Sequence, residues 1–190
     1  MVGASTGGPR ALATLLGGLA APFPVPVLVA QHMPGPFLPL LAQRLAAETG
    51  HDVRLADQGS LVRPGRILLA PGDRHMVVRG PETRASVGLR ATPPEHYCRP
   101  AVDPLMRSAA AVFGAATLGV VLTGMGEDAS AGSRAIVAAG GQVVVQDEAS
   151  SVVWGMPGAV ARAGLAAASV SITELAAAVS GLCHAVAAGQ

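Results

Sequence analysis

The sequence has few aromatic residues, few charged residues and only two cysteines. Aromatic residues make up 3% of the 190 positions, so a hydrophobic core has to be built from Ala, Val and Leu. The cysteines, Cys98 and Cys183, lie far apart, which excludes a disulfide framework and a paired-cysteine zinc motif and favours a reducing, cytoplasmic setting. The formal net charge of +1 gives no electrostatic signature of binding to nucleic acid or to an anionic membrane.

A long uncharged hydrophobic run is also missing. The most apolar stretch, residues 159–188, is interrupted by two charged residues and a histidine, whereas a membrane-spanning helix needs about 20 nearly uncharged residues. Residues 1–5 contain no basic region followed by an apolar run, so they do not resemble a signal peptide. With 51% hydrophobic and 13% charged residues, the composition is typical of a compact globular chain. We therefore expect one soluble domain over residues 1–190, without membrane insertion.

Short runs rich in β-branched residues, bounded by Gly and Pro, predict buried strands. Four such runs cover residues 25–30, 66–70, 118–123 and 142–146, and Met1-Val2 has the character of the end of another strand. Runs of this kind are typical of a parallel sheet that is covered on both faces.

Between these runs the pattern predicts helices over residues 9–19, 36–48, 103–113 and 130–139. Near the C-terminus, apolar residues recur at spacings of three and four between Ile172 and Val186, which predicts a helix that packs on the core. Strands that alternate with helices indicate an α/β domain with a mostly parallel sheet. The proline-rich segment 81–100 is the least regular part of the chain and is expected to form a small hairpin or a long surface loop.

In open α/β sheets, binding sites lie just beyond the carboxyl ends of the strands. The segments that follow the predicted strands bring one serine, two histidines and two aspartates to the same edge of the sheet. These residues are Ser5, Asp73, His32, His75 and Asp128.

The first of these segments, Gly3-Ala4-Ser5-Thr6-Gly7, fits the G-x-S-x-G pattern of a nucleophilic serine. In that pattern the serine lies on a tight turn between a strand and a helix, and the helix directs its N–H groups and positive dipole end at the site. The alternative is a glycine-rich loop in which Ser5 caps the helix. The pattern alone does not decide between the two.

A serine hydroxyl is a poor nucleophile unless a base lies beside it. His32 is the best candidate, because it ends a buried apolar strand where a charged residue is costly. His75 has a similar position and is a competing candidate, and a histidine that simply binds the backbone remains an alternative for either one. The other histidines, His51, His96 and His184, lie in loop-like or helical contexts and are weaker candidates.

A serine–histidine pair also needs an acid that fixes the imidazole tautomer. Asp128 ends the glycine-rich turn that follows the strand 118–123, and Asp73 and Glu127 are rivals. The alternative for Asp128 is a cap of the helix that begins near Ser130.

Two other kinds of site are weaker. The glycine-rich segment 124–129, with Asp147 further on, loosely fits a dinucleotide-binding fingerprint. Cys98 lies near His96 and Arg99, which could lower its pKa and make it a nucleophile. No phosphate-binding loop and no H-E-x-x-H motif occurs, so we expect neither a cofactor nor a metal.

Six segments, in this order along the chain, carry a resemblance to a known family: 3–8 (GASTGG), 31–34 (QHMP), 70–76 (APGDRHM), 102–106 (VDPLM), 122–128 (LTGMGED) and 153–157 (VWGMP). The chain resembles the catalytic domain of the chemotaxis protein-glutamate methylesterases (CheB-type). The resemblance runs through nearly the whole sequence.

This resemblance implies a doubly wound α/β fold, a Rossmann-like three-layer sandwich. It implies a triad of Ser5, His32 and Asp128, a backbone N–H of Met125 in the oxyanion hole, and Thr6 beside the nucleophile. The implied substrates are methyl-esterified glutamates on the cytoplasmic helices of methyl-accepting chemotaxis receptors, hydrolysed to glutamate and methanol, and also receptor glutamines, which are deamidated. Another ester or amide substrate on the same scaffold, or a dinucleotide, is the alternative.

The chain departs from the family's usual pattern in two ways. The 190 residues contain no receiver domain, whose phosphorylation relieves inhibition in the family, so we expect a single catalytic domain. Position 129 is Ala where Gly is usual, so the placement of Asp128 depends on whether the backbone there needs a conformation that Gly prefers.

Overall fold

The computed structural model describes the backbone of residues 1–188 and the side chains of residues 1–183. The strands are β1 (Val2–Ala4), β2 (Val27–Gln31), β3 (Asp52–Leu55), β4 (Arg66–Leu69), β5 (His75–Arg79), β6 (Ser86–Arg90), β7 (Leu118–Val121), β8 (Gln142–Gln146) and β9 (Ala168–Val170). The α-helices are α1 (Gly8–Gly17), α2 (Leu38–Thr49), α3 (Val102–Phe113), α4 (Ser130–Ala138), α5 (Met156–Arg162) and α6 (Leu175–Ala188).

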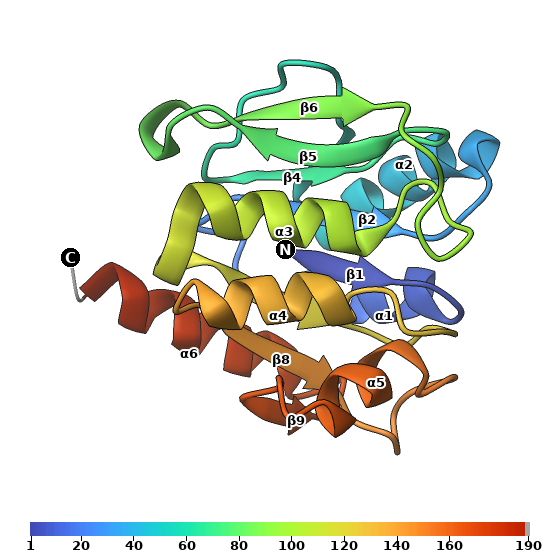
Figure 1. The fold of residues 1–190 in the computed structure, drawn as a ribbon, viewed down its shortest axis with the longest axis vertical. Helices are drawn as coiled ribbons and strands as arrows, with labels where there is room; N and C mark the ends of the chain where they lie inside the picture. The colour runs from blue at the N-terminus through green and yellow to red at the C-terminus, as the bar shows by residue number, and fades with distance from the viewer. Residues whose placement is uncertain (189–190) are drawn as a thin grey trace.

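Seven strands form a parallel sheet in the order β3-β4-β2-β1-β7-β8-β9, and β5 and β6 form a separate antiparallel hairpin (Figure 1). Helices α1, α2 and α6 pack on one face of the sheet, and α3, α4 and α5 cover the other. The hairpin packs beside α3 (Figure 1). This three-layer arrangement confirms the predicted α/β class with helices on both faces of a parallel sheet.

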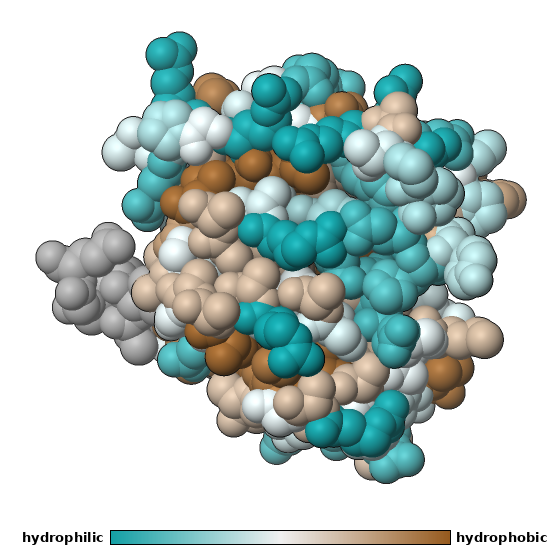
Figure 2. Space-filling view, in the orientation of Figure 1, coloured by the Kyte–Doolittle hydropathy of each residue, from teal (hydrophilic) through white to brown (hydrophobic). Residues whose placement is uncertain are grey.

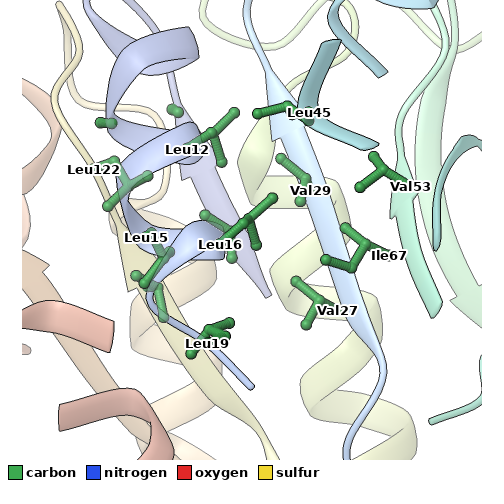
Figure 3. Packing of buried hydrophobic residues seen from close by; sticks show 14 of the residues in the cluster. Leu12, Leu15, Leu16, Leu19, Val27, Val29, Leu45, Val53, Ile67 and Leu122 are labelled. Atoms are coloured by element: carbon green, nitrogen blue, oxygen red, sulfur yellow. The ribbon is translucent and has the colours of Figure 1, made fainter. Parts of the chain in front are cut away.

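The two faces of each central strand pack into two different hydrophobic clusters. In β2, Val27 and Val29 contact the layer of α1 and α2, whereas Leu28 and Ala30 contact the layer of α3. Because successive side chains of a strand point to opposite faces, a strand that is buried on both sides has to be apolar throughout. Figure 3 shows the first cluster, in which leucines of α1 such as Leu16 point toward the valines of β2.

The four strands and four helices predicted from the sequence are confirmed, with ends displaced by up to two residues. Pattern reasoning missed β3, β9 and α5, because each is short and only partly apolar. The hairpin pairs residues 75–79 with residues 86–90, so it begins before the segment 81–100 in which it was expected. No helix in the described part of the chain combines the length and hydrophobicity needed to cross a membrane.

Figure 2 shows the face formed by α3, α4 and α5, where hydrophobic and hydrophilic residues alternate over the surface. At the level of β1 and α3, the right-hand side of this view is mostly hydrophilic. The arrow of β1 points to that side in Figure 1, so this is where the carboxyl ends of the parallel strands lie.

Candidate active site

The predicted site residues follow three neighbouring strands at the centre of the sheet. Strand β1 lies between β2 and β7. After β1 the chain runs through α1 to β2 on one side of β1, whereas β7 lies on the other side of β1 and follows α3 in the chain. A change of direction of this kind leaves a crevice beyond the carboxyl ends of the strands. Ser5 follows β1, His32 follows β2 and Asp128 lies in the loop after β7, so the fold brings all three to this end of the sheet.

Ser5 lies in the tight turn between β1 and α1. Its N–H donates to Thr123 O at 3.0 Å, which ties the turn to the end of β7. Gly7 has a φ of 81° and occupies the N-cap position of α1, where no side chain accepts a hydrogen bond from the helix. Ser5 is therefore not the cap of α1, and the turn has the strand-to-helix geometry that the G-x-S-x-G pattern predicts.

The loop after β7 packs directly against the serine. A Cβ atom on Gly124 would lie 2.7 Å from Ser5 Cβ, and one on Gly7 would lie 2.7 Å from Val152 Cγ2. Glycine at these two positions lets the backbone of three loops approach closely around Ser5.

His32 and Asp128, which are 96 positions apart in the sequence, form a direct hydrogen bond. His32 Nε2 lies 2.7 Å from Asp128 Oδ2 and donates its proton to the carboxylate. The tautomer that this bond selects leaves the His32 Nδ1 lone pair free to accept a proton. The side chain of Asp128 is 1% exposed and that of His32 10% exposed, so little water competes for the bond.

Ser5 and His32 come together through strand register. Ala4 pairs with Gln31, and the N–H of His32 donates to Ala4 O at 2.9 Å, so the two side chains follow neighbouring strands at matching positions. Within the described residues, Ser5 Oγ makes no hydrogen bond to another protein group. Ser–His bonds of catalytic sites often tighten only when substrate is bound.

Three backbone N–H groups hold the Asp128 carboxylate. Val102 donates to Oδ2 at 2.6 Å, while Asp103 and Ala129 donate to Oδ1 at 2.9 and 2.8 Å. Val102 and Asp103 form the first turn of α3, whose positive dipole end favours an anion. Burial alone raises the pKa of Asp128, but the hydrogen bonds from His32, Val102 and Asp103 outweigh it, so the pKa lies below its ordinary value.

Asp128 is thus not the cap of the helix that follows it. The N-cap position of α4 belongs to Ala129, which has a φ of 85° and no side-chain cap, while Asp128 reaches across to α3. The left-handed backbone of Ala129 is the conformation that Gly prefers, as the departure from the family pattern suggested. Ala129 accommodates it and keeps its N–H on Asp128.

The rival candidates do not reach the site. Both ring nitrogens of His75 are bound to backbone: Nδ1 accepts from Ala101 N–H at 3.1 Å, and Nε2 donates to Pro93 O at 3.0 Å. Asp73 and Glu127 are exposed, and neither bonds to His32 within the described part of the chain.

Cys98 differs from the expectation for a reactive cysteine. Burial and the nearby charge of Asp128 raise the pKa of its thiol, whereas a cysteine nucleophile needs a lowered one.

Two backbone donors beside Ser5 are free. Among the described residues, no protein group accepts a hydrogen bond from the N–H of Thr6 or of Met125. The N–H groups of Gly155 and Met156 both donate to Gly124 O, at 3.1 and 2.8 Å, which fixes the turn that carries Met125. Such fixed, unoccupied donors are what an oxyanion requires.

Two glutamines that sequence reasoning did not single out fasten the loops of the site. Gln31 Nε2 donates to Ser5 O and to His32 O, both at 2.9 Å, so one amide joins the loops that follow β1 and β2. Gln146 Oε1 accepts from Thr123 N–H at 2.9 Å, and its Nε2 donates to Ser150 O, so it joins the loops that follow β7 and β8. Each is the last residue of its strand and is buried, and a buried polar residue at that position was the available signal.

We expect Gln31→Leu to loosen the site while keeping the fold. The change removes both hydrogen bonds of the Gln31 amide, which should lower the free energy of unfolding by about 1–2 kcal/mol and reduce turnover. Urea denaturation followed by circular dichroism measures the stability. Gln43→Leu on the exposed side of α2 is the matched control. Equal stabilities of the two variants would contradict the fastening role.

The polar groups around Asp128 and at the start of α4 make hydrogen bonds within the protein. One possible metal-ligating atom from each of His96, Asp103 and Asp128 lies within 4.8 Å of the other two. Each carboxylate oxygen in this group already accepts a hydrogen bond from a histidine or from a backbone N–H. Asp103 Oδ1 also accepts a hydrogen bond of 2.6 Å from the N–H of Gly132 in the first turn of α4. A pyrophosphate bound at the start of this helix would need such N–H groups as donors. Asp147 accepts from the N–H of Ser150 within its own loop.

The fold and the residues at the carboxyl ends of its strands define the class of protein. It is a three-layer α/β domain with a serine, a histidine and an aspartate at the carboxyl ends of its central strands. The chain belongs to the CheB methylesterase family, whose model matches residues 1–179. The resemblance inferred from the six segments is therefore confirmed.

Individual relatives agree with the family assignment. The chain is 49% identical over 176 residues to the protein-glutamate methylesterase/protein-glutamine glutaminase 1 of Paramagnetospirillum magneticum, a match that covers 92% of the chain and 46% of that protein. It is 51% identical over 175 residues to the enzyme of the same name from Nocardioides sp., covering 92% of the chain and 48% of that protein. The chain thus spans about half the length of the curated relatives it matches.

A solved structure matches over almost its full length. The crystal structure of the Thermotoga maritima CheB methylesterase catalytic domain superposes with a TM-score of 0.93 at 35% identity, covering 95% of this chain and 96% of that one. The predicted doubly wound, Rossmann-like fold is confirmed by this match.

Proposed function

We propose that this chain is a catalytic domain that hydrolyses methyl esters of protein glutamate side chains and deamidates protein glutamine. The names of its relatives state these two activities. The observation that carries the proposal is the 2.7 Å hydrogen bond from His32 Nε2 to Asp128 Oδ2, at the same end of the sheet as Ser5. An ester and an amide of the same side chain pass through the same kind of tetrahedral intermediate, so one site suffices for both.

In the proposed mechanism, Ser5 Oγ attacks the ester carbonyl carbon while His32 Nδ1 takes the hydroxyl proton. The His32 imidazolium, held by Asp128, then gives this proton to the departing methoxide, and methanol leaves. A water molecule attacks the acyl-enzyme, His32 again takes and returns the proton, and glutamate is released from a regenerated Ser5. With a glutamine substrate the leaving group is ammonia.

The free N–H groups of Thr6 and Met125 support the stabilisation of the oxyanion in both steps. Thr6 lies in the loop that carries Ser5, and Met125 lies in the loop after β7. Neither N–H group needs to break a bond within the described part of the protein to bind the developing charge. Preorganised donors of this kind typically contribute about 3–4 kcal/mol of transition-state stabilisation each.

The surroundings of Ser5 support a macromolecular substrate. Met125 and Val152 are 74% and 68% exposed and lie on the loops that flank the serine. A site bordered by exposed apolar side chains is suited to a side chain that another protein presents. We infer that the substrates are the cytoplasmic helices of methyl-accepting chemotaxis receptors, and that the domain acts in the cytoplasm.

The test is hydrolysis of a receptor cytoplasmic fragment whose glutamates carry tritiated methyl esters. We expect the purified chain to release volatile tritiated methanol. If no methanol is released while Ser5 still hydrolyses p-nitrophenyl acetate and reacts with a fluorophosphonate, the chain is a serine hydrolase with another substrate. If the fluorophosphonate does not label Ser5 either, the hydrolase assignment itself is wrong.

A further inference from the structure

A second histidine–aspartate pair lies directly behind the first. His96 Nε2 lies 2.9 Å from Asp103 Oδ2, and the Asp103 side chain is 1% exposed. The other oxygen of Asp103 accepts the N–H of Gly132. The mechanism proposed above uses neither His96 nor the Asp103 side chain.

The two pairs are joined through the first turn of α3. The backbone N–H of Asp103 donates to Asp128 Oδ1, while the carboxylates of these two residues lie within 4.8 Å of each other, both almost fully buried. Two anions at this distance in a buried setting repel each other, and burial together with the charge of Asp128 raises the pKa of Asp103. A nearby positive charge therefore favours the state in which both carboxylates are ionised. His96 is the histidine placed to supply it.

The backbone around His96 is held in a costly conformation. His96 and Tyr97 have φ values of 49° and 61°, in the left-handed region that residues other than Gly rarely adopt. Reciprocal hydrogen bonds between Glu95 and Cys98, at 3.1 and 2.8 Å, close this turn. Strain of this kind persists where a side chain is needed in one place, and here it directs His96 onto Asp103.

We propose that His96 is a positioning residue of this site: its imidazolium, held on Asp103, balances the two buried carboxylates and thereby limits how readily His32, on the far side of Asp128, keeps a proton. The inference rests on the proposed hydrolase function for its kinetic consequences. Its electrostatic consequence, an effect of His96 on His32, holds in the free protein.

The charges around His96 favour its protonated form. Burial lowers the pKa of His96, but the hydrogen bond to Asp103 and the charges of Asp128, Asp103 and Glu127 raise it above its ordinary value overall. Glu95 lies on the same turn, but both of its carboxylate oxygens accept from Arg107 Nη2.

The test compares the wild type with His96→Gln, which can still donate an amide N–H to Asp103 but carries no charge. We expect the pKa of His32, followed by NMR of its ring nitrogens, to rise by about 0.5–1 unit in the variant, because a neighbouring cation is lost. The kcat/KM ratio of wild type to variant should be about 3- to 10-fold near pH 6. It should approach one near pH 9, where the wild-type His96 is neutral and the two proteins carry the same charge at this position.

Two further variants separate charge from structure. The double variant His96→Gln/Asp103→Asn removes both members of the pair, and its pH profile should return toward that of the wild type. Glu95→Gln, on the same turn, removes a charge that does not contact Asp103, and it should leave the His32 titration unchanged. If His96→Gln does not fold, His96→Asn replaces it, since Asn is tolerated in a left-handed backbone.

An unchanged His32 pKa in His96→Gln overturns the proposal, and so does a rate loss of the same size at every pH, because a purely structural role would act in that way. The NMR titration needs no substrate. A shifted His32 pKa in a protein that does not hydrolyse methyl esters would therefore leave this inference standing while the proposed function fails.

Discussion

Ser5→Ala is expected to lower the rate of methyl ester hydrolysis by about 10⁴-fold or more while leaving the fold intact. In the proposed mechanism, the change removes the oxygen atom that forms the acyl-enzyme. It costs little stability, because Ser5 Oγ has no hydrogen-bond partner among the described residues and the turn is held by backbone bonds to Thr123 and Gly8. Methanol release measures the rate, and thermal unfolding measures the stability.

Ser130→Ala is the matched control for this experiment. Ser130 lies two residues after Asp128, and its buried Oγ also lacks a hydrogen-bond partner in the described structure. The control variant should keep wild-type activity. Residual activity of Ser5→Ala near the wild-type level would remove Ser5 from the role of nucleophile, whatever the control shows.

Asp128→Asn is expected to have the second-largest effect, a loss of about 10³- to 10⁴-fold in kcat. The carboxylate accepts the Nε2 proton of His32 and so keeps the Nδ1 lone pair free for the Ser5 proton. An Asn amide that turns its NH₂ toward His32 selects the opposite tautomer and places a proton on Nδ1.

The same change should also destabilise the fold. If the oxygen of the Asn side chain faces His32, the NH₂ group of the Asn lies against the N–H groups of Asp103 and Ala129, which are also donors. If the Asn amide is flipped, its NH₂ group lies against the N–H group of Val102. At least one buried donor then lacks an acceptor, which costs about 1–3 kcal/mol in unfolding free energy. Asp57→Asn, at an exposed position, is the control and should change neither quantity.

The stability difference between wild type and Asp128→Asn should depend on pH. The folded-state pKa of Asp128 is lower than that of an unfolded Asp, about 3.9, so its stabilising contribution is complete above that pH and is lost as the pH falls through the folded value. Urea unfolding at pH 7 and at pH 3 should show the gap narrowing in acid. A constant gap would mean that the charge of Asp128 does not contribute to folding.

Much of the site was predictable because it follows from local rules. The G-x-S-x-G pattern located Ser5, and the rule that sites lie beyond the carboxyl ends of parallel strands added His32 and Asp128. The same rule also admitted Asp73 and His75, because a one-dimensional pattern does not show which way a side chain points. The tertiary structure excludes both residues as members of the site. His75 belongs to the hairpin and binds backbone groups through both ring nitrogens, and Asp73 is exposed and does not bond to His32.

The partners of Asp128 were not predictable in this way. The sequence suggests a cap for the next helix, α4, whereas the carboxylate binds the first turn of α3, 25 residues earlier. Long-range pairing of this kind depends on how two helices pack on a sheet, and no local pattern encodes it. The same holds for Gln31, which fastens Ser5 across 26 residues.

The sequence by itself determined the α/β class and the central strands, because strand periodicity and Gly-rich turns act within a few residues. The end-of-strand rule gave five candidate residues, and the family resemblance selected Ser5, His32 and Asp128 among them. Only the tertiary structure decided that His32 bonds through Nε2, that α3 holds Asp128, and that a second pair, His96 and Asp103, lies behind it. The first two features arise where segments 96 and 26 residues apart meet, and the third depends on a left-handed turn that local patterns do not show. Burial and distance set the charge and hydrogen-bond balance at each of these places.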